Sequence, residues 1–134
     1  MRSTRIVTSF IKDNDKFLLL KRSDKVKTMK GLWAGISGVI EKGEEPINRA
    51  KIEIYEELGI TEDKIKFLKA ADKMKVHSPQ YENHEWEIFP FLFEAEGPTI
   101  KLNWENSEYK WITIDEIGNY QTVPSIDKVL LSLL

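Results

Sequence analysis

The sequence predicts an α/β or α+β sandwich built from several strands and two or three helices. Three observations support this fold class: short strand-like runs in both halves of the chain, an amphipathic helix between them, and an apolar-faced helix at the C-terminal end. The chain has 134 residues, of which 41% are hydrophobic, and this is enough to form the core of one domain over residues 1–134.

Two strands joined by a tight turn are expected first. Residues 6–12 and 16–21 are strand-like, and the Asp13-Asn14-Asp15 segment between them has the side chains of a hairpin turn. Residues 21–30 are basic and are expected to form a loop, and the glycine-rich residues 31–46 are expected to form strand and loop.

The predicted helix that starts at Pro46 is the clearest element. Pro46 suits a first helical position, because its missing N–H has no partner there, and Gly59 suits the C-terminal stop. Two acidic residues precede Pro46, where the helix dipole favours negative charge. Apolar side chains recur at spacings of three and four residues and form one face, made of Ile47, Ala50, Ile54 and Leu58.

Two longer strands are predicted after this helix. They cover residues 66–76 and 85–96, and a polar turn around residues 78–84 joins them. Pro90 lies inside the second run, and because proline cannot donate a ladder hydrogen bond, it predicts an edge strand or a bulge.

The C-terminal part is expected to hold a short strand and a final helix. The strand covers residues 109–114, and a weak helical turn begins at Ile117. Residues 125–134 are expected to form a helix whose inward side chains are Ile126, Val129, Leu130 and Leu133.

The amino-acid composition leaves carboxylates as the main candidates for catalytic or metal-binding groups. Twenty Lys and Arg against 22 Asp and Glu give a net charge of −2, which argues against general binding of a nucleic-acid polymer. The absence of cysteine excludes disulfides, thiolate zinc sites and cysteine nucleophiles. The two histidines, His77 and His84, fall near a predicted hairpin turn, where a structural or exposed position is the more usual one.

No run of residues is long and apolar enough to predict a membrane span. The first residues also lack the apolar core of a signal peptide, and the expected location is therefore the cytoplasm.

An acidic cluster stands on the central helix. Glu53, Glu56 and Glu57 are spaced i, i+3, i+4 and should project from one side of the helix, roughly opposite the apolar stripe. Three carboxylates this close repel one another, and a hard divalent cation such as Mg²⁺ would remove the repulsion. A solvated helix face is the structural alternative. Glu41 and Glu44 lie just before the helix and can fold back toward the same place.

The spacing around this cluster resembles the Nudix box, G-x5-E-x7-R-E-U-x-E-E-x-G-U, in which U is aliphatic. The match covers residues 38–60, from Gly38 through Glu44 to the acidic cluster, and it fills every fixed position of the signature except one. Trp33, five residues before Gly38, also stands where many members of the family carry an aromatic residue.

The resemblance implies a fold and an activity. Nudix proteins share an αβα sandwich with a mixed sheet, in which the box forms a loop-helix-loop that holds a divalent metal. They hydrolyse nucleoside diphosphates linked to another moiety, by attack of water on phosphorus. The resemblance implies Mg²⁺ as cofactor, with Mn²⁺ as a substitute. Carried over to this chain, Glu53, Glu56 and Glu57 would be metal ligands and catalytic residues, Gly38 would ligate through its carbonyl, and Glu44 would support the loop.

Position 52 departs from the box, because Ile52 stands where the family has Arg. In the family, that Arg holds the catalytic carboxylates in place. Arg49 lies four residues before Glu53, and we expect it to compensate through an i, i+4 ion pair. The Ser37-Gly38 segment also differs from the Pro-Gly-Gly of many relatives, without removing a ligand.

A later carboxylate is expected to join the site. Many relatives place an acidic residue a few positions before a Trp on the last sheet strand. Trp111 fits that Trp, so Glu105 is the first candidate and Glu108 the second. Glu53, Glu57 and this later Glu all stay open as the general base.

Substrate contacts are expected near the end of the second strand. Lys21 and Arg22 match a place where many relatives contact substrate. The lysines of the following loop, Lys25, Lys27 and Lys30, either raise the local potential for an anion or are solvated. The candidates to stack on a nucleobase are Trp33, Tyr81, Trp86, Trp104 and Tyr109.

The leading hypothesis is a Mg²⁺-dependent Nudix pyrophosphohydrolase acting on a small-molecule nucleotide, such as a nucleoside triphosphate. Hydrolysis of ADP-ribose or of dinucleoside polyphosphates is a close alternative. A Nudix fold that serves as a low-turnover nucleotide sensor is a second class of function, and Ile52 is its support in the sequence. The sequence leaves the oligomeric state open, with a homodimer as one option.

Overall fold

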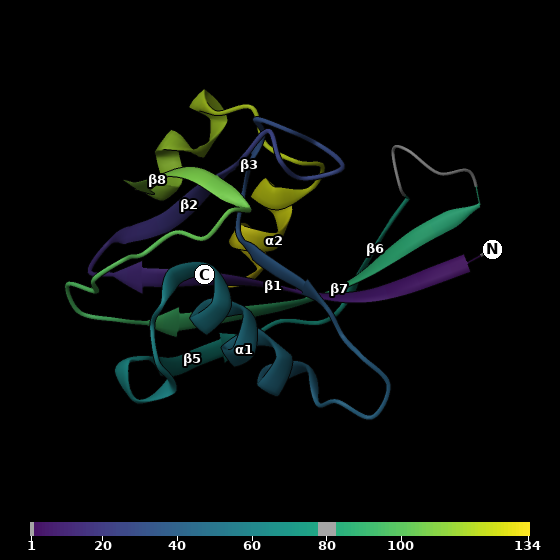
Figure 1. Ribbon diagram of the computed structural model, residues 1–134, viewed down its shortest axis with the longest axis horizontal. Coiled ribbons are helices and arrows are strands. Elements are labelled where there is room, and N and C mark those ends of the chain that lie inside the picture. The colour runs from purple at the N-terminus through teal and green to yellow at the C-terminus, as the bar shows by residue number, and fades with distance from the viewer. Residues whose placement is uncertain (1, 78–82) are drawn as a thin grey trace.

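In the computed structural model, residues 2–77 and 83–134 are described, and they form one eight-stranded mixed sheet with a helix on each face (Figure 1). The strand order is β3-β2-β1-β7-β5, while β4 pairs with β1, β6 with β7 and β8 with β2. The central pair, β1 and β7, runs parallel over its whole length, from Arg2 beside His84 to Lys12 beside Glu94.

The elements follow one another in a fixed order along the chain. The strands are β1 (Arg2–Asp13), β2 (Lys16–Arg22), β3 (Trp33–Ala34), β4 (Ile36–Val39), β5 (Lys66–Ala70), β6 (Met74–His77), β7 (His84–Glu94) and β8 (Asn106–Ile112). The helices are α1 (Pro46–Leu58), the 3-10 turns η1 (Glu62–Lys64) and η2 (Ile114–Asn119), and α2 (Ile126–Ser132).

Each face of the sheet carries its own core, because side chains alternate along the strands. On β1, Val7 and Ile11 pack under α1, whereas Phe10 packs on the opposite face under α2. The predicted inward face of α2 is buried, and so is the predicted apolar stripe of α1 except for Ile47, which is partly buried. The mixed sheet between two helical layers confirms the predicted fold class.

Helix α1 begins and ends where the sequence predicts. Pro46 occupies its first turn, and Gly59 follows it with φ of 72°, a left-handed conformation that favours glycine. The Gly59 N–H donates to the carbonyl of Tyr55 and closes the last turn. The box therefore forms a loop, a helix and a second loop.

One strand prediction was wrong in its extent. Residues 66–76 do not form one strand but two, β5 and β6, which pair with different halves of β7. Pro90 lies at the break between them, and the N–H of Ala71 donates to its carbonyl. The peptide of Pro90 therefore faces the break, so that its missing N–H removes no ladder hydrogen bond although β7 lies inside the sheet. The edge-strand alternative was therefore wrong, whereas the pairing of β7 with β5 and β6 shifts by one residue across Pro90, as the bulge alternative expects.

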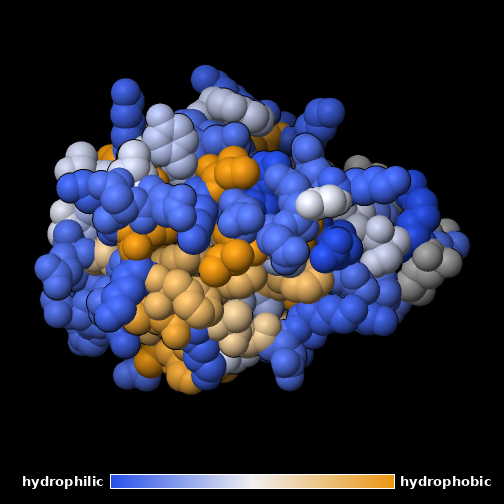
Figure 2. All heavy atoms as spheres, turned by 90° about the horizontal axis from the view of Figure 1, so that it is seen from below, coloured by the Kyte–Doolittle hydropathy of each residue, from blue (hydrophilic) through white to orange (hydrophobic). Residues whose placement is uncertain are grey.

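The face that carries α1 and β5 exposes apolar side chains, which gather near its centre (Figure 2). The large hydrophobic residues exposed on these two elements are Ile52, Tyr55, Phe67 and Leu68. Dimerisation, one option that the sequence leaves open, stays untested. Within the described ranges, none of the helices combines the length and the apolar character needed to cross a membrane.

Candidate active site

Strand β4 and helix α1 meet at Gly38 and Glu53. A Cβ atom on Gly38 would lie 2.3 Å from the carboxyl carbon of Glu53, so only glycine leaves room for that carboxylate. Glu53 itself is 8% exposed. The first glycine of the box therefore has a steric role in this chain, which is to let the backbone of β4 approach an acidic side chain of α1.

Arg49 joins two carboxylates of the box. Its Nη1 donates to Glu53 Oε2 at 3.0 Å, and its Nε and Nη2 donate to the two oxygens of Glu44 at 2.9 and 2.6 Å. Glu44 extends the network, because its Oε1 also accepts a hydrogen bond from the backbone N–H of Glu41. The predicted i, i+4 ion pair between Arg49 and Glu53 is present. Hydrogen bonds from Arg49 and Glu41 lower the pKa of Glu44, and the carboxylates raise the pKa of Arg49.

We expect Arg49→Ala to lower both metal affinity and turnover by about tenfold or more, the usual loss when a group that supports a metal ligand is removed. The reason is that Glu53 would keep its burial but lose its counterion. Calorimetric metal titration and steady-state kinetics measure the two effects. Lys51→Ala is the matched control, because Lys51 also lies on α1 but forms an exposed ion pair with Glu62 of η1. Unchanged affinity and turnover in Arg49→Ala would rule out the compensating role.

Glu57 is the most deeply buried acidic residue of the site, at 4% exposure. Its Oε1 accepts a hydrogen bond from Asn106 Nδ2 at 3.1 Å, and no donor among the described residues reaches its Oε2. Burial is the main cause that raises the pKa of Glu57 well above its usual value, and the charge of Glu105 raises it further. Burial also raises the pKa of Glu53, against the opposing effect of Arg49.

The acidic cluster is not opposite the apolar stripe, and this sequence expectation was wrong. Glu53 and Glu57 lie on the flank of α1 and are buried, while Glu56 alone of the three is exposed. On a helix, a residue one position before the stripe is turned by about 100° and not 180° from it. Glu53 precedes Ile54 and Glu57 precedes Leu58, so each carboxylate borders the core.

Glu105 and Arg22 face these carboxylates from the other side. Glu105 is half-buried just before β8, and its Oε1 accepts a hydrogen bond from Asn103 Nδ2. Arg22, at the end of β2, donates from Nε and Nη2 to the carbonyl of Thr28. Burial lowers the pKa of Arg22, and the charges of Glu105 and Glu57 oppose that shift.

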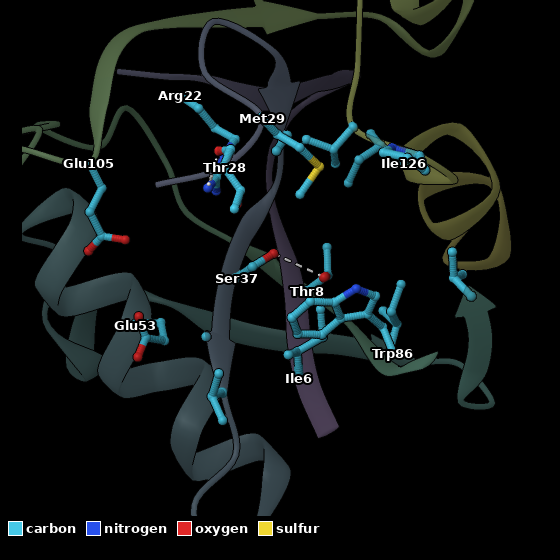
Figure 3. Close-up of a pocket in the computed structure, with 17 residues that line it drawn as sticks. Ile6, Thr8, Arg22, Thr28, Met29, Ser37, Glu53, Trp86, Glu105 and Ile126 are labelled. Carbon is cyan, nitrogen blue, oxygen red and sulfur yellow. Dashed lines mark hydrogen bonds between the residues drawn. The ribbon is translucent and has the colours of Figure 1, made fainter. Parts of the chain in front are cut away.

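A cavity of about 420 Å³ connects this cluster to an apolar recess. Glu53 and Glu105 lie at its acidic end, and Met29, Ile126 and Trp86 lie at the other end (Figure 3). The remaining lining residues are Ile6, Thr8, Arg22, Thr28, Ala34, Ser37, Gly38, Val39, Val76, Ile88, Val123 and Pro124. The cavity therefore offers carboxylates and an arginine to one half of a ligand and an apolar wall to the other half.

Several predicted contacts lie outside this cavity. Trp33 is buried in the core and packs edge-on against Tyr120 at 5.2 Å, so it does not line the cavity. Lys21 forms an exposed ion pair with Glu108 at 3.3 Å, away from the acidic cluster. Tyr81 lies outside the described residues. Of the other aromatic residues proposed to stack on a nucleobase, Trp86 lines the cavity, whereas Trp104 and Tyr109 are exposed.

The two histidines take no part in the acidic cluster. His84 contacts Thr4 through its Nε2, and His77 is exposed on β6. The lysines Lys25, Lys27 and Lys30 are exposed in the segment between β2 and β3.

Sequence reasoning missed Asn106 and Met29. Asn106 is buried and holds one oxygen of Glu57, and Met29 lines the cavity with φ of 53°. Asn106 directly follows Glu105, so a polar residue at the start of the last strand was the available signal. Nothing in the sequence around Met29 marks its backbone conformation.

The acidic side chains are not arranged as a complete set of metal ligands. Across residues 2–77 and 83–134, no three His, Cys, Asp or Glu side chains are gathered into such an arrangement. Glu53 is turned to Arg49 and Glu57 to Asn106, while Glu56 faces solvent.

The chain matches known proteins along its length. The family model of the NUDIX domain matches residues 2–134. An RNA pyrophosphohydrolase of Bartonella clarridgeiae is 31% identical over 107 residues, which are 66% of this chain and 61% of that protein. The chain thus spans about three fifths of that curated relative.

Solved structures share the fold. The MutT protein of Methanosarcina mazei superposes with a TM-score of 0.76 at 22% identity, covering 97% of this chain and 91% of that one. An Ap4A hydrolase of C. elegans, solved as a binary complex, superposes with a TM-score of 0.74 at 16% identity, covering 98% and 94%. This chain belongs to the Nudix family.

Proposed function

We propose that the protein is a metal-dependent pyrophosphohydrolase that cleaves a phosphoanhydride bond of a nucleoside triphosphate or of a nucleoside diphosphate linked to another moiety. The observation that carries this proposal is the buried Glu57, whose Oε2 no described donor reaches and which lies close enough to Glu105 and Glu53 for their charges to raise its pKa. Buried carboxylates that repel one another are costly unless a cation joins them. A cation is therefore the missing partner.

The donor set fits Mg²⁺, with Mn²⁺ as a substitute. Hard cations prefer carboxylate and carbonyl oxygens, which Glu53, Glu56, Glu57 and the carbonyl of Gly38 offer. Such a cation neutralises phosphate oxygens and lowers the pKa of a bound water. Arg49 would hold Glu53 and Asn106 would hold Glu57 in the orientation that ligation needs.

The remaining side chains supply proton transfer and binding. A water attacks phosphorus, a new P–O bond forms, and the anhydride P–O bond breaks with the bridging oxygen leaving on the departing phosphate. Glu105 would take the proton of that water, because it lines the cavity and forms no ion pair with a described residue, whereas Glu53 is bound to Arg49. Arg22, on the same wall, would bind the phosphate chain.

Ile52 favours the alternative of a sensor with little turnover. Its apolar side chain is 40% exposed on α1 and has no hydrogen-bond donor, so it cannot hold a carboxylate as the Arg of the box does. Arg49 takes that place through its contacts to Glu53 and Glu44, and this favours the enzyme over the sensor.

We extend three further expectations to the whole protein. Residues 1–134 act as one domain, the protein works in the cytoplasm, and its substrate is a small nucleotide and not a nucleic-acid polymer. The name of the Bartonella clarridgeiae relative makes RNA the competing substrate.

A substrate panel tests the proposal. Hydrolysis products are separated and quantified by chromatography after incubation with canonical and oxidised nucleoside triphosphates, ADP-ribose, NADH, dinucleoside polyphosphates and a 5′-triphosphorylated RNA, in Mg²⁺ and in EDTA. We expect Mg²⁺-dependent turnover of one small-nucleotide class. Nucleotide binding without turnover of any substrate would favour the sensor, and turnover of the RNA alone would contradict the small-molecule substrate.

A further inference from the structure

The apolar end of the cavity lies between two groups of side chains. Met29 and Ile126 lie on one side of it, and Trp86 and Ile6 lie on the other (Figure 3). The indole of Trp86 is held in place by His84, whose ring lies 5.0 Å away. A planar group between Met29 and Trp86 would contact a polarizable thioether on one face and an aromatic ring on the other.

This end of the cavity offers few groups that could read the edge of a ring. Its described lining contains no Asn, Gln, His or Asp side chain. Two nearby backbone positions also offer no free N–H: that of Val123 donates to Trp33 O at 3.0 Å, and Pro124 has none. A site selects one base by presenting a fixed pattern of donors and acceptors, and the described side chains of this recess present no such pattern.

The neutral polar groups of the described lining are the hydroxyls of Thr8, Thr28 and Ser37 and the indole N–H of Trp86. A hydroxyl can donate or accept a hydrogen bond, whereas the indole N–H can only donate. Thr8 Oγ1 and Ser37 Oγ lie 3.0 Å apart, and either of them can be the donor. A hydroxyl rotates and can donate or accept, so the pair can serve an amino group or a carbonyl of a ligand equally well. It lies between the acidic end and the apolar end (Figure 3).

Met29 is held toward the cavity by a strained turn. Its φ of 53° is uncommon for a residue with a side chain, and the N–H of Leu32 donates to its carbonyl at 3.3 Å. The neighbouring carbonyl of Thr28 is bound by Arg22. Strain of this kind persists where the surrounding structure fixes a side chain, and here it fixes one wall of the recess.

We propose that the recess binds the nucleobase by stacking between Met29 and Trp86 without reading its edge, so that the protein accepts all four bases. This inference rests on the proposed function and adds its base selectivity. The protein would then select its substrates by their phosphate chain, which would bind at the acidic end of the cavity. Purines should bind somewhat better than pyrimidines, because they stack more strongly.

Kinetics on ATP, GTP, CTP and UTP in Mg²⁺ test this inference. We expect the four kcat/KM values to fall within about tenfold of one another, and Trp86→Ala to raise KM for all four by about tenfold, the usual loss of one stacking contact. Trp86→Phe should restore most of the loss. Trp104→Ala is the matched control, because that indole is 60% exposed and lies outside the cavity lining.

A preference for one base above about a hundredfold, or a Trp86→Ala effect confined to one base, would overturn the inference, since either requires a group that reads the base edge. An unchanged KM in Trp86→Ala would also overturn it. Calorimetry with the imido analogues of the four triphosphates separates this inference from the proposed function. Equal binding of the four analogues, with no hydrolysis of the natural triphosphates, would support the stacking site and overturn the proposed enzymatic activity. If none of the analogues binds, both proposals are overturned.

Discussion

Glu57→Gln should lose at least about a hundredfold in turnover and gain stability in the absence of metal. The loss follows because the cation that Glu57 would help to hold would contribute several kcal/mol to stabilising the developing charge. The gain follows because the substitution removes a buried charge while Gln keeps an oxygen for Asn106. We expect the gain to appear as a higher midpoint of thermal unfolding.

The stability gain should depend on pH in a defined direction. Burial raises the pKa of Glu57 in the folded protein, so ionisation of this group costs stability at neutral pH. As the pH falls through the folded-state pKa, the carboxyl takes up a proton and the cost disappears. The advantage of Glu57→Gln should therefore be largest at neutral pH and should shrink toward the unfolded-state pKa of about 4.3.

Thermal unfolding in EDTA across pH and steady-state kinetics in Mg²⁺ measure the two effects. Glu108→Gln is the matched control, because it changes an exposed carboxylate that pairs with Lys21. A Glu57→Gln protein that is both fully active and no more stable would show that Glu57 is an ordinary buried side chain.

Gly38→Ala is expected to lower turnover by about a hundredfold and to destabilise the fold by about 1–3 kcal/mol, the usual cost of overpacking. The added Cβ would lie 2.3 Å from the Glu53 carboxyl carbon. Glu53 must then move, and its ion pair with Arg49 must break or shift.

Urea unfolding and kinetics of Gly38→Ala test this steric role. Gly118→Ala is the matched control, because no heavy atom lies within 4 Å of the Cβ it would add and its backbone needs no positive φ. Wild-type turnover in Gly38→Ala would mean that the position of Glu53 is not important for the reaction.

The central helix and the spacing of the box were predictable because both depend on local patterns. Pro46, the apolar stripe and Gly59 act within a few residues of one another, and α1 has the predicted bounds. The Arg49–Glu53 pair was predictable for the same reason, since the geometry of one helix brings residues four apart together.

Features that depend on contacts between distant elements were not predictable. The division of residues 66–76 into β5 and β6 depends on how β7 is shared between them. The bond from Asn106 to Glu57 joins residues 49 positions apart. Trp33 lies in the core because η2 brings Tyr120 against it. In each case the sequence marks a residue but not its partner.

Titration with Mn²⁺, followed by the EPR signal of the free ion, decides whether the cluster of Glu53, Glu56 and Glu57 is a metal centre. We expect the wild-type protein to remove free Mn²⁺ from solution, Mg²⁺ to compete for the same site, and Glu57→Gln to lose most of this binding while it stays folded. Equal binding by the wild type and Glu57→Gln, or no binding by either, would contradict the assignment of the site.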